Sequence, residues 1–173
     1  MKKINNTNTK KQNGFAMIEM LIALGVAAIV IIFAYVVFSY AMSKIHESRA
    51  ISQISTIEEG VHELYANSHD FSDITTQTII DGHIADKGDI INKDTIVSQW
   101  YGKDSSSIVT VAPASNPGTF TVTMASVPAD SCAKVADAFL DNNLSVGGTV
   151  ITTPASLTTA CASADKADIA VTF

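Results

Sequence analysis

The sequence lacks most of the patterns that carry chemistry in enzymes. Only 16% of its 173 residues are charged, and it contains no Gly-x-Ser-x-Gly elbow and no phosphate-binding glycine loop. Its two cysteines, Cys132 and Cys161, are too far apart for a redox Cys-x-x-Cys pair. We therefore expect a protein that is not an enzyme and that needs no cofactor.

The histidines and acids give little support to a metal site. His62-Glu63 begins like a zinc-protease motif, but Ala66 stands where the second histidine is needed, and His69 lies roughly 10 Å away along a helix. We interpret both histidines as solvated helix residues. Three further acids match no EF-hand spacing and are interpreted as a solvated turn: Asp86, Asp89 and Asp94.

Positive charge is also scarce. The chain has 11 basic and 17 acidic residues, a formal net charge of −6. A nucleic-acid-binding surface needs clustered cations to neutralise phosphates, so we expect no nucleic-acid partner.

The apolar run that begins near Gly14 is the dominant feature. No residue between Met20 and Phe38 is charged, and about 19 residues at about 1.5 Å each form a helix of roughly 28 Å, close to the ~30 Å core of a bilayer. This segment is long enough to span a membrane. Glu19 is the one ionisable residue at its head, and an acid in lipid is costly unless a partner neutralises it.

The residues before this run complete a family signature. Met1–Asn13 is basic and contains no acid, Gly14-Phe15 opens the run, and Glu19 is the fifth residue counted from Phe15. A basic leader ending in Gly, followed by Phe-x-x-x-Glu at the head of an apolar helix, resembles the prepilin signature of type IV pilins. The resemblance implies that a prepilin peptidase cuts between Gly14 and Phe15 and that Phe15 becomes N-methylated. We expect Glu19 to act in assembly, paired with the amino group of a neighbouring Phe15.

Two simpler explanations of the apolar run remain open. A secretory signal peptide has an apolar core of roughly 7–15 residues before a small-residue cleavage site, whereas this run is longer and only Ala41-Met42-Ser43 follows it as a weak site. A plain signal anchor explains the length and the basic flank, but it requires no acid at the fifth position after a glycine.

The lysines before the span predict its orientation. Because four lysines and no acid precede the apolar run, the positive-inside rule keeps the leader in the cytoplasm and exports the rest of the chain. In an oxidising compartment, Cys132 and Cys161 have one possible intramolecular pairing. A bridge closing about 30 residues would stabilise the domain by roughly 3–4 kcal/mol. The alternative, two free buried thiols, fits a cytosolic protein better.

The rest of the chain predicts an α+β fold. An apolar stripe formed by Ile54, Ile57, Val61 and Leu64 continues the helix, so we expect one helix from Phe15 to about Asn67. A short helix at 76–82 follows, and residues 90–101 are expected to cover the core without regular structure. Alternating apolar residues and turn signals then predict strands at 108–112, 119–125, 144–146, 149–151 and 168–173. A helix that carries Cys132 is expected to begin with Asp130-Ser131 as its N-cap.

The resemblance to pilins extends into this region and favours the type IVb branch, especially plasmid-borne pilins of thin conjugative pili. Trp100-Tyr101-Gly102, Phe120-Thr-Val-Thr123, the helix opened by Cys132, and the terminal apolar strand follow that order. Phe15 as first mature residue and the short leader are closer to the type IVa branch.

The resemblance implies three parts: a cleaved leader (1–14), a transmembrane and polymerisation segment (15–42), and an exported pilin domain (43–173). We interpret the chain as a major pilin that passes from the bacterial inner membrane into an extracellular filament of its own copies. That filament would serve adhesion, aggregation or conjugation, with the prepilin peptidase and the pilus assembly machinery as further partners. A minor pilin, a type II secretion pseudopilin, and a signal-anchored periplasmic enzyme or binding protein are the alternatives.

Overall fold

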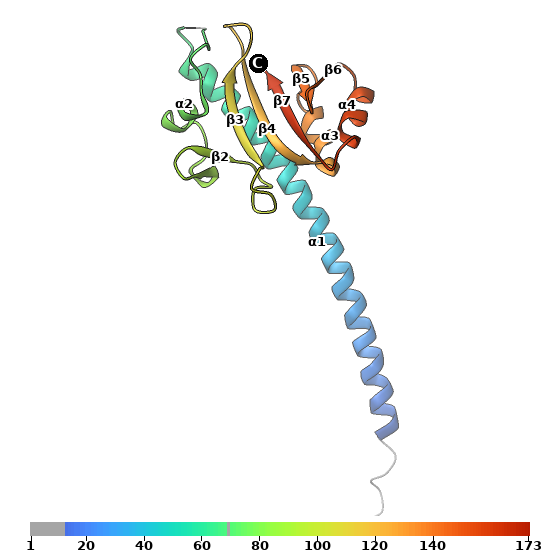
Figure 1. Ribbon diagram of the computed structural model, residues 1–173. Helices are drawn as coiled ribbons and strands as arrows, with labels where there is room; N and C mark the ends of the chain where they lie inside the picture. The colour runs from blue at the N-terminus through green and yellow to red at the C-terminus, as the bar shows by residue number, and fades with distance from the viewer. Residues whose placement is uncertain (1–12, 69) are drawn as a thin grey trace, which may run out of the picture. The chain divides into compact units, whose positions relative to one another are not determined.

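The longest element of the computed structural model, which describes residues 13–68 and 70–173, is helix α1 (Asn13–Leu64) (Figure 1). No proline occurs in this stretch, so nothing in it removes a backbone donor from the helix. The helix lies within three residues of the predicted bounds at each end. By its internal contacts the chain divides into two units after Met42, and α1 continues through that division.

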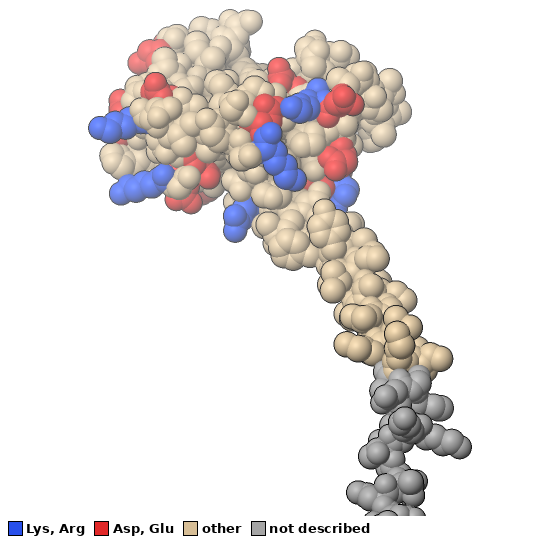
Figure 2. Space-filling view, turned by 60° about the horizontal axis from the view of Figure 1, so that its bottom comes forward, with Lys and Arg blue, Asp and Glu red and all other residues tan. Residues whose placement is uncertain are grey.

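Between Met20 and Met42, α1 carries no charged residue, and Glu19 is the one described charge before Met42. Large apolar side chains from Met17 to Tyr40 are exposed, and the segment is long and apolar enough to cross a membrane, with a mean hydropathy of 3.0. On the face that Figure 2 shows, no charged side chain lies on the coloured part of this segment, whereas Lys, Arg, Asp and Glu side chains are seen on the globular unit.

The second part of α1 is amphipathic and packs within the globular unit. Ala50, Ile54, Ile57 and Val61 are at most 1% exposed, and their spacing of four, three and four residues places them on one stripe. Leu64, predicted as the end of this stripe, is instead 51% exposed. The prediction was wrong there because Leu64 is the last helical residue and lies beyond the packed turns.

A seven-stranded antiparallel sheet packs against this stripe in the order β1-β2-β3-β4-β7-β5-β6. The α+β fold and the mostly antiparallel sheet are confirmed. The strands are β1 (Ile90–Ile91), β2 (Thr95–Val97), β3 (Ile108–Pro113), β4 (Phe120–Pro128), β5 (Asn143–Val146), β6 (Thr149–Ile151) and β7 (Lys166–Thr172).

Strand β4 lies at the centre of the sheet and has the clearest alternation. Phe120, Val122 and Met124 are fully buried toward the core, while Thr121 and Thr123 alternate with them. The predicted hairpin of β4 with β3 is confirmed, with Val111 opposite Val122. Strand β7 pairs along the other side of β4, so the last strand of the chain completes the middle of the sheet (Figure 1).

The connection between α1 and β3 contains more regular structure than we predicted. The short helix is confirmed as α2 (Thr76–Asp81), with Thr75 forming a capping box, and a 3₁₀ turn η1 (Lys87–Asp89) follows. Strands β1 and β2 correct the expectation of irregular structure, because they pair with each other and extend the sheet beyond β3. At two and three residues, they are too short to produce a periodic pattern.

The region between β4 and β7 contains helices α3 (Ala129–Asp137) and α4 (Pro154–Ala162) with the β5–β6 hairpin between them. The predicted hairpin turn is confirmed: Gly147 and Gly148 have φ of 55° and 78°, which primed turns require. The predicted cap of α3 was wrong, because Pro128 is the N-cap and Ser131 is a buried residue inside the helix. Helix α4 was not predicted from the sequence.

Candidate assembly site

The predicted processing residues lie at the start of α1. The helix begins at Asn13, so the backbones of Gly14 and Phe15 belong to its first turn, while the leader before Asn13 lies outside the described residues. Glu19 is exposed, one turn further along, and its carboxylate has no hydrogen-bond or ion-pair partner among residues 17–68 and 70–173. An exposed acid beside exposed Met20 and Leu21 is unfavourable in lipid unless a partner neutralises it, and the described side chains of this chain supply none.

The cysteines form a disulfide inside the globular unit. Cys132 lies in α3 and Cys161 in α4, their Cα atoms are 5.7 Å apart, and both side chains are buried. The bridge therefore fastens α3 to α4 and closes a loop that contains the β5–β6 hairpin. Both helices are nine residues long, and the covalent link holds them together.

A buried carboxylate joins α3 to α1. Glu47 is 6% exposed; its Oε2 accepts a hydrogen bond from Lys44 Nζ at 2.9 Å, and its Oε1 lies 3.6 Å from Lys134 Nζ. The Ser131 hydroxyl also donates to Glu47 Oε1, at 3.4 Å. Burial opposes ionisation of Glu47, but the hydrogen bond from Lys44 and the charges of both lysines outweigh it and hold the pKa below its ordinary value.

This cluster was not predicted from the sequence. Glu47 and Lys134 are 87 residues apart, and no local pattern pairs them. Ser131, which was expected to cap α3, lies inside that helix with its side chain buried. A buried hydroxyl needs a polar partner, and Glu47 is that partner.

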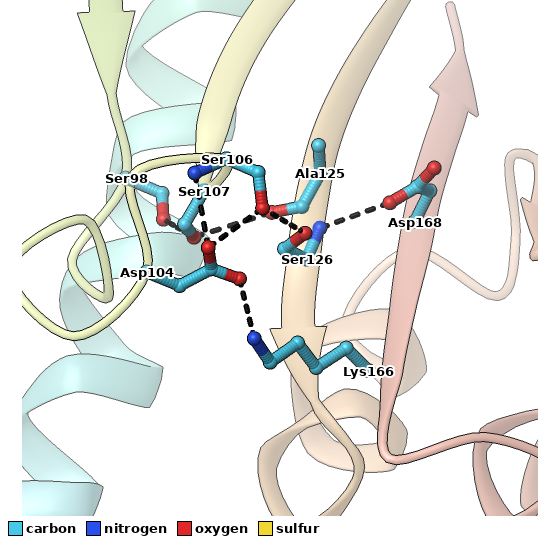
Figure 3. Close-up of polar contacts among 8 residues, drawn as sticks. All are labelled: Ser98, Asp104, Ser106, Ser107, Ala125, Ser126, Lys166 and Asp168. Carbon is cyan, nitrogen blue, oxygen red and sulfur yellow. Dashed lines mark hydrogen bonds and ion pairs between the residues drawn. The ribbon is translucent and has the colours of Figure 1, made fainter.

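A second polar cluster connects the loop before β3 to residues of β4 and β7 (Figure 3). Lys166 Nζ lies 2.7 Å from Asp104 Oδ2, and Asp104 Oδ1 accepts hydrogen bonds from the backbone and the hydroxyl of Ser106. The Ser106 hydroxyl contacts the Ser126 hydroxyl at 2.8 Å, and the Ser126 backbone N–H donates to Asp168 Oδ1.

Ser126 explains why this cluster lies where it does. Its φ of 54° belongs to a bulge where the pairing of β4 with β7 shifts between Met124 and Val127. Because of the bulge, the Ser126 backbone N–H does not take part in the hydrogen bonds between β4 and β7. It donates to the Asp168 carboxylate instead. This arrangement was also missed, because its members come from three separate segments.

The residues considered for metal binding do not converge. His62 packs against the rings of Phe71 and Phe120, and Asp94 accepts a hydrogen bond from the adjacent Thr95 hydroxyl. Within the part of the chain that the structure describes, no three His, Cys, Asp or Glu residues are placed to hold a metal ion. His69 lies outside the described residues.

Two features together are typical of the type IV pilin class. A long amino-terminal helix packs its second half on an antiparallel sheet, and a disulfide between α3 and α4 ties the carboxy-terminal part of the chain. Comparison with known families agrees: residues 9–35 match the prokaryotic N-terminal methylation motif, and residues 44–173 match the family described as PilS N terminal. The chain belongs to this PilS family of type IV pilins. Pilins are structural subunits, so the chain is not an enzyme, and the predicted family is confirmed.

A solved structure has the same fold. The crystal structure of type IV b pilin from Salmonella typhi aligns with a TM-score of 0.55 and 17% identity, covering 72% of this chain and 97% of that chain. A search of curated proteins found no match.

Proposed function

We propose that this chain is the major subunit of a type IVb-like pilus. Its leader (1–14) is removed by cleavage between Gly14 and Phe15, and Phe15 is then N-methylated. The mature chain assembles with other copies through residues 15–42, and the domain at 43–173 faces outward. The filament serves adhesion, aggregation or conjugative mating contact.

This proposal rests on the order of the two family matches along the chain. The methylation motif at residues 9–35 contains Gly14, Phe15 and Glu19, and the pilin family match begins at residue 44, just after the apolar segment. The exposed apolar side chains between Met17 and Tyr40 need either lipid or the equivalent helices of other copies. Insertion in the inner membrane followed by polymerisation supplies these two environments in turn.

The charge pattern and the disulfide support the proposed route. The leader lysines keep residues 1–14 in the cytoplasm, where a prepilin peptidase acts, and the globular domain passes to the periplasm. A disulfide between Cys132 and Cys161 suits that oxidising compartment. The pilus assembly machinery then transfers the processed chain into the filament.

Cleavage after Gly14 is tested by the variant Gly14→Leu, with Gly25→Ala as a control inside the helix. We expect full-length precursor to accumulate in the inner membrane for Gly14→Leu, because a bulky side chain replaces the hydrogen that the peptidase accommodates. Amino-terminal sequencing of the product is the measurement. Phe15 termini in the Gly14→Leu variant would contradict the assignment, and a terminus near Lys44 would indicate a secretory signal peptide instead.

Subunit stoichiometry tests the choice of a major pilin over a minor pilin or a secretion pseudopilin, which share this fold. Mass spectrometry of sheared surface filaments should find this chain as the bulk of the protein. A substoichiometric amount would assign it to the minor subunits.

A further inference from the structure

Arg49 and Lys103 are two exposed cations that lie near the same turn of α1. Burial lowers the pKa of His46, and the charges of Lys103 and Arg49 lower it further, so both cations are close to His46. Neither forms an ion pair with an acid among the described residues, although the charge of Arg49 also acts on the partly buried Asp89. The described part of the chain therefore does not fully compensate these two charges.

Two further cations lie beside the neighbouring residue of α1. Lys44 and Lys134 share the buried carboxylate of Glu47, so this group of three keeps a net positive charge. Asp130, in the first turn of α3, offsets one charge, but an excess of cations remains. Figure 2 shows Lys and Arg side chains beside the first turns of α1 in the globular unit. We call the surface formed by Lys44, Arg49, Lys103 and Lys134 the cationic surface.

The cationic surface contrasts with the rest of the globular unit. Seven of the 11 basic residues and 16 of the 17 acidic residues lie in the range 43–173, so its net charge is −9. The last turns of α1 and the chain after them, residues 50–73, contain no Lys or Arg and five acids: Glu58, Glu59, Glu63, Asp70 and Asp73. The first of these acids follows Met42 by about 24 Å along the helix. Charge is therefore distributed unevenly along α1, with cations near its entry into the unit and acids near its end.

The apolar segment of α1 ends immediately before the cationic surface. No charge occurs between Met20 and Met42, and Tyr40 lies near the end of this stretch, as is typical of tyrosine at membrane–water interfaces. Lys44 and Arg49 follow Met42 by about 3 Å and about 10 Å along the helix. The headgroup layer extends about 5–8 Å beyond the hydrocarbon core, and long cationic side chains reach back toward it. Both cations are therefore within reach of lipid phosphates when residues 15–42 span a bilayer.

We propose that the cationic surface binds the phosphate groups of anionic phospholipids before the subunit enters a filament. This inference rests on the proposed function, which places residues 15–42 in the inner membrane. An anionic bilayer attracts Arg49 and Lys103 and repels the acidic residues 58–73, so the contact holds the globular unit in one orientation. The acidic end of a second copy is a different partner for the same cations. Lipid is favoured because α1 brings the cations to the headgroups in a single chain.

Paramagnetic relaxation NMR on the full chain, in nanodiscs that hold one chain each, tests this inference. One set of discs contains phosphatidylcholine alone, and the other contains phosphatidylcholine mixed with phosphatidylglycerol. Both carry a trace of phosphatidylcholine with a nitroxide on its headgroup. We expect a stronger relaxation enhancement at the amides of residues 101–106 in the anionic discs. High salt should remove the difference, because it screens exposed charges. Equal enhancement in both kinds of disc would overturn the proposal.

Single substitutions test which cations make the contact. Each cation near an anionic surface contributes roughly fivefold to binding, so Lys103→Gln and Arg49→Gln should each lower the ratio of docked to undocked chain about fivefold. Both side chains are exposed and neither contacts Glu47, so the amide spectrum should show a retained fold. Lys93→Gln is the matched control, because it removes one exposed lysine in the turn between β1 and β2. An equal loss for Lys93→Gln would show that net charge, rather than the cationic surface, determines binding, and would overturn the proposal.

Filament counts separate this inference from the proposed function. Chains that contact anionic lipid but form no filaments would refute the pilus assignment and leave the lipid contact intact. Chains that form filaments but respond equally to both kinds of disc would overturn the lipid contact alone. If the amide signals of residues 101–106 changed only in discs with two chains, whatever the lipid charge, the partner would be the acidic end of a second copy and the lipid proposal would be wrong.

Discussion

Lys166 Nζ lies 2.7 Å from Asp104 Oδ2, and this ion pair joins the first residue of β7 to the loop that precedes β3. The hydrogen bond from Lys166 contributes most, followed by those from Ser106, in holding the pKa of Asp104 far below its ordinary value of 3.8. The Asp104 carboxylate therefore stays ionised in the folded chain at every physiological pH.

The variant Asp104→Asn should lose a small part of the stability of the globular unit at neutral pH. A carboxyl group whose pKa is depressed by folding stabilises the fold above its ordinary pKa, and this contribution is lost as the pH falls below about 4. The difference in unfolding free energy between wild type and variant should therefore shrink on acidification.

Urea unfolding followed by the fluorescence of Trp100, the one tryptophan in the sequence and 4% exposed, measures this difference at each pH. Asp94→Asn is a suitable control, because among the described residues the Asp94 carboxylate accepts a hydrogen bond only from the neighbouring Thr95 hydroxyl. If the difference in unfolding free energy between wild type and Asp104→Asn grew in acid, the lowered pKa assigned to Asp104 would be contradicted.

Gly60→Ala should destabilise the globular unit although alanine is the better helix former. A β-carbon at Gly60 would lie 2.4 Å from Ile84 Cγ2, so the segment after α2 has to move away from α1. Overpacking of this kind costs about 1–3 kcal/mol, against the ~1 kcal/mol that alanine gains in helix propensity. We expect a net loss, measured as a lower urea midpoint for Trp100 fluorescence.

The double variant Gly60→Ala with Ile84→Ala tests the cause. Ile84→Ala removes Cγ2 and with it the 2.4 Å contact, so the cost of Gly60→Ala should fall in that background. Gly25→Ala serves as the control, because nothing lies within 4 Å of a β-carbon there. Equal costs of Gly60→Ala in both backgrounds would mean that the contact with Ile84 is not the reason.

Replacing both cysteines, Cys132→Ser with Cys161→Ser, should lower steady-state pilin and piliation together. The bridge closes a sequence separation of 29 residues, and its loss would remove roughly 3–4 kcal/mol of the ~5–15 kcal/mol typical of a domain. Urea unfolding of the purified chain and counts of surface filaments are the measurements. Thiol labelling of both cysteines in native, unreduced filaments would contradict the bridge.

Local patterns in the sequence predicted the elements that are long or marked by turn residues. The alternation around Val122 identified β4, and the paired glycines at 147 and 148 identified the turn between β5 and β6. Helix α4 was missed although a signal was present: Thr153 and Ser156 form a capping box, and Pro154 occupies the first turn. Its small residues give no clear apolar face, so the cap was the only local evidence.

In the candidate site, too, residues close together in the sequence were predicted and contacts between distant segments were not. Gly14, Phe15 and Glu19 lie within six residues, so their spacing is visible in the sequence. The contacts of Glu47 with Lys134, and of Asp104 with Lys166, join segments that only the folded sheet brings together. Pairs of this kind carry no local spacing rule, which is why sequence patterns could not predict them.

Glu19→Val should block assembly while it leaves earlier steps intact. In a single chain in lipid, the Glu19 carboxylate has no described partner, and valine at this position removes a group that lipid disfavours. Insertion, cleavage after Gly14 and folding of the domain at 43–173 should therefore proceed as in wild type. In the proposed filament, the amino group of a neighbouring Phe15 pairs with Glu19 in a core of low dielectric constant, and the variant loses that pair.

The role of Glu19 in this proposal is to fix the axial register of neighbouring subunits. A buried ion pair roughly offsets its own desolvation, so its loss should cost little total binding energy but should allow apolar helices to slide past one another. Glu19→Asp, one methylene shorter but still acidic, should be milder than Glu19→Val. The measurement is the number of surface pili relative to the pool of processed protein in the inner membrane. If the Val variant made wild-type numbers of filaments from a normal pool, Glu19 would be a tolerated acid near a helix end, and register would have to come from contacts between the globular domains.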